Sequence, residues 1–460
     1  MQLEQKSLDA FLEAVKKLDA GFAGLPAFES DVPGRAGIAE ALAATAERLH
    51  DNYPYFHPLY AGQMLKPPHP VARLAYALAM WINPNNHALD GGRATSAMEK
   101  EAVAQIAAMF GWKEFLGHLC GGGTMANLEA LWVASQVHPG KKFLASEQAH
   151  YTHKRISAVL QLQCESVACD SRGRMDMNAL AQVVARGDVG TVVATMGTTA
   201  TGSVDPLPEI LASSEKHRFR VHADAAYGGY FGLAANLGDE AARSFARIGE
   251  ADSIVIDPHK HGLQPYGCGC VLFRDPSAGR FYKHDSPYTY FSSAELHLGE
   301  ISLECSRPGA AAAALWTTQR LLPLVRGGEF ARGLERGREA ALALYQRIEK
   351  DDRFVAAFPP ELDIVIFAPR AESVSEASAL SRRIFDAAAK RDLHLAVAEL
   401  PTIFWAANLG PMRRDRETMT CLRSVLMKSE HLDWIPRIWD ELSAATSEVL
   451  GAESASRTAC

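Results

Sequence analysis

Four short apolar segments, separated by longer polar stretches with helical periodicity, constrain the fold of this chain more than any other feature. They read TVVATMG, FRVHADAA, ADSIVIDP and CGCVLFRD, at residues 191–197, 219–226, 251–258 and 268–275. Apolar runs of this length are typical of strands that are buried on both faces. Such strands, separated by helices, predict an α/β fold with a mostly parallel sheet covered by helices on both faces.

The periodicity changes along the 460 residues and predicts three parts. Residues 1–75 combine an amphipathic helical pattern with a Pro- and His-rich stretch, and predict an N-terminal helical and extended segment. Residues 76–325 contain the four apolar segments and predict a large domain. Residues 326–460 contain long, charged helical patterns and the apolar run ELDIVIFAP, and predict a smaller C-terminal α+β domain.

Composition and charge argue against several classes of function. The formal net charge of −7 is spread along the chain without basic blocks, so nucleic acid is not an expected partner. No apolar stretch approaches the roughly 20 residues that span a bilayer, and acidic side chains interrupt the N-terminal helical pattern, so we expect neither a membrane segment nor a secretory signal.

The cysteines are scattered and lack the spacing of a disulfide scaffold or a zinc ribbon, so we expect no metal site and a cytoplasmic location. Cys268 and Cys270 are one residue apart in an apolar run, which predicts that both are buried on the same face of a strand.

The motif SIVIDPHKHG, residues 253–262, places Lys260 directly after an apolar strand. At the end of a buried strand an ammonium group is partly desolvated, which favours the neutral amine that forms an imine with a carbonyl. For an isolated lysine, a solvated loop side chain would be the simpler interpretation.

The motif VHADAAYGG, residues 221–229, places Asp224 at the end of the preceding strand. The aspartate could cap a helix. Because an imine-forming lysine follows one strand later, it could instead keep a pyridine nitrogen protonated and make that ring an electron sink.

Three further motifs are weak individually and informative together. CGGGTMANLEALWVAS, residues 120–135, runs three glycines into a helix, where backbone amides and the helix N-terminus can bind an anion. ASEQAHYTHKR, residues 145–155, presents His150, which could lie flat against an aromatic ring. MGTTATGSVDPL, residues 196–207, is a turn that can offer hydroxyl groups to the same ring.

In this order, the motifs resemble the PLP-dependent decarboxylases of the glutamate, aromatic amino acid and tyrosine decarboxylase family, over roughly residues 50–435. The resemblance implies the aspartate-aminotransferase-like fold (fold type I), with a mostly parallel seven-stranded sheet in the large domain. It implies pyridoxal 5'-phosphate (PLP) as the cofactor, held by Lys260 as an imine. It also implies decarboxylation of an L-amino acid to the amine and CO2.

The resemblance assigns a role to each position of the cofactor site. Catalytic roles fall to Lys260, His150 and Asp224. The implied contacts are phosphate binding by Gly123 and Thr124, ring stacking by His150, ring packing by Ala226, a ring-facing hydroxyl on Thr199, pairing with the pyridine nitrogen by Asp224, and the His-Lys pair of His259 and Lys260.

Two further positions follow from segments that resemble the family's later motifs. ECSRPGAAAAALW resembles its Ser-Arg-x-Gly segment, which implies that Ser306 binds the phosphate of the neighbouring subunit. The active site would then be shared across a homodimer. The Leu-Arg pair near the C-terminus implies that Arg423 binds the α-carboxylate of the substrate.

Substrate, proton donor and reaction type stay open at this point. Ala368 follows Phe367 where family members commonly carry arginine, which leaves the choice between aromatic, acidic and other amino acids undecided. Candidate proton donors are Tyr288, Tyr290 and His259. Nine residues either line the entrance or serve packing: Tyr55, Phe56, His57, Tyr60, Trp81, Asn83, Asn85, Asn86 and His87.

Two alternatives to decarboxylation use the same residues. An aminotransferase or a carbon–carbon or carbon–sulfur lyase of fold type I would share the ring-binding positions. A non-catalytic homologue that binds PLP is disfavoured, because binding alone requires neither Lys260 nor Asp224.

Overall fold

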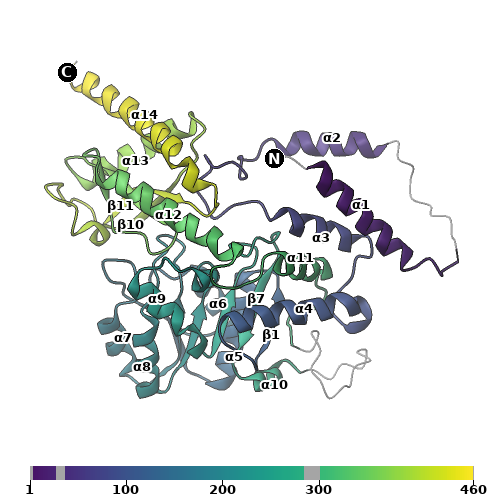
Figure 1. Cartoon of the computed structure of the whole chain (residues 1–460). Coiled ribbons are helices and arrows are strands. Elements are labelled where there is room, and N and C mark those ends of the chain that lie inside the picture. The colour runs from purple at the N-terminus through teal and green to yellow at the C-terminus, as the bar shows by residue number, and fades with distance from the viewer. Residues whose placement is uncertain (1–3, 27–36, 284–300, 459–460) are drawn as a thin grey trace.

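The chain is built on a large, mostly parallel sheet and a smaller antiparallel sheet, in a computed structural model that describes residues 4–26, 37–283 and 301–458 (Figure 1). The larger sheet has seven strands in the spatial order β1-β7-β6-β5-β4-β2-β3. In chain order they are β1 (Leu116–Cys120), β2 (Lys142–Ser146), β3 (Cys164–Val167), β4 (Val189–Thr195), β5 (Arg220–Asp224), β6 (Ser253–Ile256) and β7 (Gly269–Phe273). Strand β7 runs antiparallel to both of its neighbours, and the other neighbouring pairs are parallel. The predicted mostly parallel, seven-stranded sheet is confirmed.

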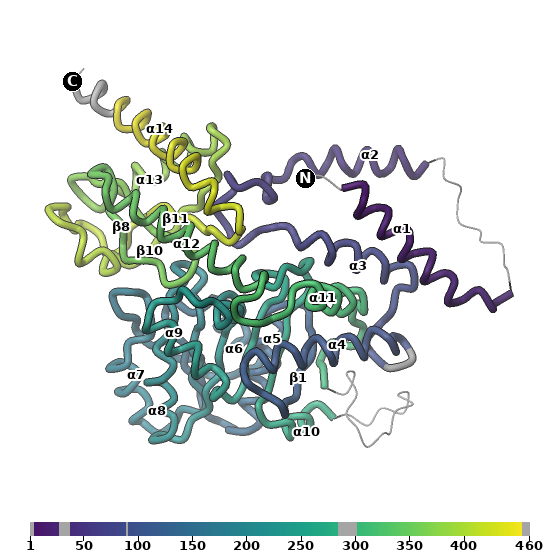
Figure 2. The backbone as a smooth tube through the Cα atoms, in the orientation of Figure 1, coloured from purple at the N-terminus to yellow at the C-terminus, as the bar shows by residue number. Residues whose placement is uncertain are grey.

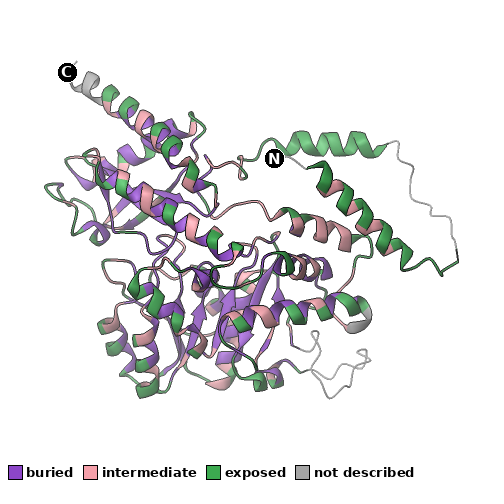
Figure 3. Cartoon of the chain, in the orientation of Figure 1, coloured by how far each residue is buried: buried purple, intermediate pink, exposed green. Residues whose placement is uncertain are grey.

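The central strands bury side chains on both faces, as continuous apolar runs predict. In β6, Ile254 and Ile256 face one apolar core, whereas Val255 faces another. The first face is covered by α4 (Leu89–Met109), α7 (Met177–Val184), α8 (Leu207–His217), α9 (Asp239–Ala246) and α11 (Gly309–Leu321), and the second by α5 (Gly123–Val137), α6 (Thr152–Leu160) and α10 (Gly279–Tyr282). Figure 3 shows the buried residues concentrated in the strands. Cys268, directly before β7, and Cys270, within it, are both buried in the first core, which confirms their predicted burial.

The smaller sheet is antiparallel, in the spatial order β10-β11-β9-β8. Its strands are β8 (Phe354–Ala356), β9 (Ile364–Pro369), β10 (Ala396–Pro401) and β11 (Thr418–Val425). Together with α12 (Glu329–Glu349), α13 (Val374–Ala389) and α14 (His431–Thr458), they form what we call the C-terminal unit. Val365 and Phe367 pack against these helices, whereas Ile364 and Ile366 join the core of the large sheet. The C-terminal unit is therefore seated directly on the large sheet.

The N-terminal helices lie along the outside of the protein. They are α1 (Gln5–Ala20), α2 (Ile38–Leu49) and α3 (Pro70–Met80). Figures 1 and 2 show α1 and α2 projecting beside the body, and neither has a buried residue. Leu12 and Leu42 are more than half exposed on them. Among the described helices, none combines the length and apolar character that a bilayer crossing requires.

Short 3-10 helices complete the connections. Those that the structure describes include η2 (Gly229–Leu233), η3 (Ile248–Glu250), η4 (Pro276–Ala278) and η6 (Thr402–Trp405).

Candidate active site

A cavity of about 470 Å³ opens beyond the carboxyl ends of β4, β5 and β6. Ligands of open α/β sheets bind at this edge, because the loops that follow parallel strands converge there. Eight of the nine predicted cofactor-binding positions line the cavity: Gly123, Thr124, His150, Thr199, Asp224, Ala226, His259 and Lys260. The fold therefore brings together residues that are far apart in the sequence.

Lys260 lies one turn beyond the end of β6 and is paired with Asp257. Its Nζ atom lies 3.1 Å from Oδ2 of Asp257, and its backbone N–H donates to the Asp257 carbonyl at 2.9 Å. The Asp257 side chain is 3% exposed, whereas that of Lys260 is 21% exposed. The lysine amine is thus held by a buried carboxylate at the wall of the cavity.

Asp224 lies at the end of β5 and accepts two hydrogen bonds. Nε2 of His153 donates to its Oδ2 atom at 2.9 Å, and the Ala226 N–H donates to Oδ1 at 3.2 Å. Burial alone would raise the pKa of Asp224, but the hydrogen bond from His153 and the nearby His222 and Lys260 hold it below its usual range. Asp224 is therefore a buried carboxylate that stays ionised, as pairing with a protonated pyridine nitrogen requires.

His150 presents an uncharged ring to the cavity. Its Nδ1 atom accepts a hydrogen bond from the Thr152 N–H at 3.3 Å, which leaves the other ring nitrogen to carry the proton. Burial lowers the pKa of His150. A neutral, flat imidazole in this position can stack on an aromatic ring without placing a second charge beside it.

The start of α5 forms a cradle at one end of the cavity. Gly122 precedes the helix with φ = 144°, a conformation that favours glycine. A Cβ atom on Gly123 would lie 2.7 Å from Oδ2 of Asp257, so the wall leaves no room for a side chain there. Oγ1 of Thr124 accepts a hydrogen bond from Thr152 at 3.1 Å. A helix N-terminus with a neighbouring hydroxyl group is a suitable site for a phosphate.

Two polar groups in the cavity wall have no hydrogen-bond partner among the described residues. They are Oγ1 of Thr195 and Oδ1 of Asp257, both of which are buried. Buried polar atoms normally find partners, so these two indicate that the cavity receives a polar ligand. Together with the lysine, the carboxylate, the flat ring and the anion cradle, the residues present fit PLP.

His259 has its Nδ1 atom 2.8 Å from the Cys268 carbonyl. A carbonyl only accepts, so Nδ1 carries the proton. The His259 ring also packs against that of Tyr266, with 4.9 Å between centroids. Burial lowers the pKa of His259.

Arg423 and Ser306 do not line this cavity. Arg423, on β11, is 4% exposed and donates to the carbonyls of Thr199, Ala200 and Gly62 and to the side chain of Gln63. Its guanidinium group thus lies directly behind the turn that carries Thr199.

Ser306 is exposed and accepts a hydrogen bond from Nδ2 of Asn85 at 3.1 Å. Its role at a neighbouring subunit stays a prediction.

The other sequence candidates lie elsewhere. Tyr288 and Tyr290 fall outside the described residues. None of the nine predicted entrance residues lines the 470 Å³ cavity. Two of them show a structural role clearly: Asn86 is buried and its side chain donates to Glu99 at 2.6 Å, and the Tyr60 ring packs against that of Tyr55 with 4.9 Å between centroids. For these two, packing rather than substrate contact accounts for the side chain.

The residues of the site that sequence reasoning missed include His153, Asp257, Thr195 and Tyr227. His153 follows His150 by three residues, and three-residue spacing next to a candidate ring-stacking histidine could have indicated it. Asp257 has the same spacing to Lys260. Nothing local indicated Tyr227, whose hydroxyl donates to Asp363 of the C-terminal unit at 2.5 Å.

Comparisons with known proteins agree with this geometry. The family model described as the pyridoxal-dependent decarboxylase conserved domain matches residues 127–370, more than half of the chain. An L-tyrosine decarboxylase from Enterococcus faecium is 29% identical over 391 residues, which cover 63% of this chain and 64% of that protein. The matched region thus spans less than two thirds of that relative. A probable L-tyrosine/L-aspartate decarboxylase from Methanothermobacter thermautotrophicus is 28% identical over 262 residues, covering 56% of this chain and 70% of that one.

Solved structures share the whole fold at low sequence identity. Mouse CSAD in its apo form superposes with a TM-score of 0.75 at 19% identity, covering 96% of this chain and 99% of that one. Oryza sativa TDC, solved with PLP and tryptamine, superposes with a TM-score of 0.75 at 18% identity, covering 97% of this chain and 99% of that one. The resemblance in the motifs, the fold and the family match agree, and the chain belongs to the pyridoxal-dependent decarboxylase family.

Proposed function

We propose that this chain is a carboxy-lyase that converts an L-amino acid into the corresponding amine and CO2 with PLP as its cofactor. One observation carries the proposal: Lys260 and Asp224, from neighbouring strand ends, line one cavity together with the N-terminus of α5. Each group matches a different part of PLP, namely the aldehyde, the pyridine nitrogen and the phosphate.

Different residues of the cavity would bind different parts of the cofactor. Gly123 and Thr124 would bind the phosphate, and His150 would stack on the ring. On the remaining sides, Ala226 would pack against the ring and Thr199 would face it. When bound, PLP supplies an electron sink for the electron pair of the breaking bond between Cα and the carboxylate.

Asp224 supports this chemistry through its charge. A carboxylate whose pKa lies below the usual range is ionised at every physiological pH. Its negative charge favours the protonated pyridine nitrogen. The His153 hydrogen bond holds the carboxylate in a single orientation, which is the kind of preorganisation that electrostatic catalysis depends on.

Arg423 is proposed to recognise the substrate's α-carboxylate. Among the described residues, Arg423 donates to three backbone carbonyls and one side-chain amide, and no carboxylate forms an ion pair with it. A buried cation without a counterion attracts an anion. Four of the five guanidinium N–H groups are used by these bonds, so one donor is left for a carboxylate.

The proton that completes the amine is proposed to come from Tyr288 or Tyr290 rather than His259. Nδ1 of His259 is occupied by the Cys268 carbonyl, and burial lowers the pKa of this histidine, so its Nε2 atom has no proton to donate near neutral pH. Replacing each tyrosine by phenylalanine and scoring the products of turnover would test the choice.

A homodimer with a shared active site forms part of the proposal. The exposed apolar side chains on α1 and α2, including Leu12 and Leu42, are suited to burial against a second copy of the chain. Ser306 would then reach the phosphate site of that copy. We also place the enzyme in the cytoplasm, because the seven cysteines among the described residues are all free thiols.

A product screen tests the reaction. Purified protein with PLP is incubated with single L-amino acids, beginning with tyrosine and aspartate because relatives carry those names. Release of CO2 together with the amine supports decarboxylation. A keto acid, or cleavage of another carbon–carbon or carbon–sulfur bond, would instead favour the aminotransferase or lyase alternative.

A further inference from the structure

We propose that Glu361 is a positioning residue for the cofactor site: it fixes the cofactor-facing turn of residues 198–204 to the C-terminal unit. The inference rests on the proposed function, because it assigns Glu361 an effect on PLP binding. Glu361 does not line the cavity and would act through the turn.

The turn is held together by its own hydroxyl groups. Oγ1 of Thr201 lies 2.7 Å from Oγ1 of Thr198 and 2.7 Å from Oγ of Ser203. The Thr198 N–H donates to the Ser203 carbonyl at 2.9 Å, and the Gly202 N–H donates to the Thr198 carbonyl at 2.8 Å. Thr199, at the tip, lines the cavity. A displacement at the base of this compact turn would therefore reach Thr199.

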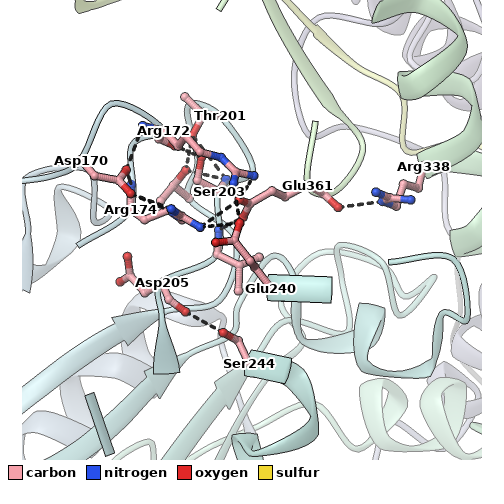
Figure 4. A network of polar contacts seen from close by, with 12 residues as sticks. Asp170, Arg172, Arg174, Thr201, Ser203, Asp205, Glu240, Ser244, Arg338 and Glu361 are labelled. Atoms are coloured by element: carbon pink, nitrogen blue, oxygen red, sulfur yellow. Dashed lines mark hydrogen bonds and ion pairs between the residues drawn. The ribbon is translucent and has the colours of Figure 1, made fainter. Parts of the chain in front are cut away.

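Glu361 binds the base of the turn through its carboxylate. It lies just before β9 and is 6% exposed. Its Oε2 atom accepts from the Val204 N–H at 2.7 Å, and its Oε1 atom accepts from Arg172 at 2.7 Å. Ser203 in turn donates to the Arg172 carbonyl at 2.6 Å, so Arg172 contacts the turn directly through its carbonyl and indirectly through Glu361 (Figure 4).

The backbone of Glu361 is itself anchored. Nε of Arg338, on α12, donates to the Glu361 carbonyl at 2.9 Å, and the same guanidinium group donates to the Asn236 carbonyl. Figure 4 shows Arg338 on the opposite side of Glu361 from Arg172 and Arg174. Because Arg338 restrains the backbone of Glu361, the carboxylate has a defined position from which it binds the turn.

Arg423 grips the same turn at its tip, through the carbonyls of Thr199 and Ala200. The C-terminal unit therefore holds the turn at two points, the tip at Thr199 and Ala200 and the base at Val204. Loss of Glu361 leaves the second point in place, so the expected effect is weaker cofactor binding rather than a complete loss.

The test compares Glu361→Gln with a matched control, Glu441→Gln. Glu441 is also in the C-terminal unit, is 7% exposed and likewise joins two arginines, Arg391 and Arg437, but lies outside the cofactor cavity. Glutamine has the same size as glutamate, yet its NH2 group must face either Val204 N–H or Arg172, so one contact is lost.

Three quantities are measured on each protein: the PLP dissociation constant, the visible circular dichroism of the bound cofactor and the thermal midpoint. We expect Glu361→Gln to weaken PLP binding roughly tenfold and to reduce the visible dichroism. Glu441→Gln should lower the thermal midpoint by a similar amount and leave both cofactor readouts unchanged.

Two results would overturn the inference. If Glu361→Gln is destabilised but binds PLP with the wild-type affinity and dichroism, Glu361 has only a structural role. If both variants weaken PLP binding equally, the loss of affinity reflects lower overall stability. Failure of the wild-type protein to bind PLP at all would instead reject the proposed function itself.

Discussion

Nε2 of His153 lies 2.9 Å from Oδ2 of Asp224, and both side chains are buried. His153 belongs to the first turn of α6, and His150 lies immediately before that helix. One helix start thus supplies both the ring that faces the cavity and the group that orients the carboxylate.

This pair predicts a defined pH dependence. The pKa of Asp224 in the folded protein lies below its ordinary value of 3.8, so the stabilisation that it provides is complete above that pH and is lost as the pH falls through the folded value. His153→Gln weakens the hydrogen bond to the carboxylate and raises the folded pKa. The variant should therefore lose PLP at a higher pH than the wild-type protein, as measured by visible absorbance during acid titration.

His50→Gln is the control for this titration, because His50 is exposed at the end of α2. Superimposable acid curves for the wild-type protein and His153→Gln would show that the hydrogen bond does not control the charge of Asp224.

The α5 cradle predicts that Gly123→Ala impairs cofactor binding. The new methyl group would lie 2.7 Å from Oδ2 of Asp257, so the carboxylate that pairs with Lys260 must move. We expect PLP affinity to fall roughly tenfold in a fluorescence titration. Gly333→Ala is the matched control: a Cβ atom there meets nothing within 4 Å inside α12, and helix propensity predicts a gain of about 1 kcal/mol. Unchanged PLP affinity in Gly123→Ala would argue against the cradle.

Much of the large sheet could be predicted, because each strand has a local sequence signal: an apolar run that ends in polar residues. The reversed direction of β7 could not, since it depends on the pairing of Val271 with His118, far away in the chain. In the site, too, some features follow from the local sequence and others depend on contacts between distant residues. Lys260 and Asp224 follow their own strands, whereas the contact of Tyr227 with Asp363 exists only after the C-terminal unit is seated.

Arg423→Gln tests recognition of the substrate carboxylate. The buried cation is removed, so KM for the amino acid should rise roughly tenfold to 100-fold. Binding of the amine product, which has no carboxylate, should change far less. Arg382→Gln is the control, because the guanidinium group of Arg382 donates to the side chain of Thr420, which also lies on β11. If binding of the amino acid and of the amine weakens equally, Arg423 acts only on the turn at Thr199.

Charge placed on the N-terminal helices should separate the subunits. Leu12→Glu combined with Leu42→Glu puts two carboxylates on exposed apolar positions of α1 and α2, and sedimentation should then detect monomers. Val159→Glu, at a residue of α6 that is 69% exposed, should leave the assembly unchanged. A double variant that sediments like the wild-type protein would contradict the proposed interface.

Borohydride reduction of the PLP-loaded protein, followed by peptide mapping, tests the central proposal most directly. We predict a single pyridoxyl-labelled peptide with the label on Lys260, and no labelled peptide from Lys260→Ala treated in the same way. A label on another lysine, or equal labelling of the two proteins, would contradict the assignment of Lys260 as the residue that holds the cofactor.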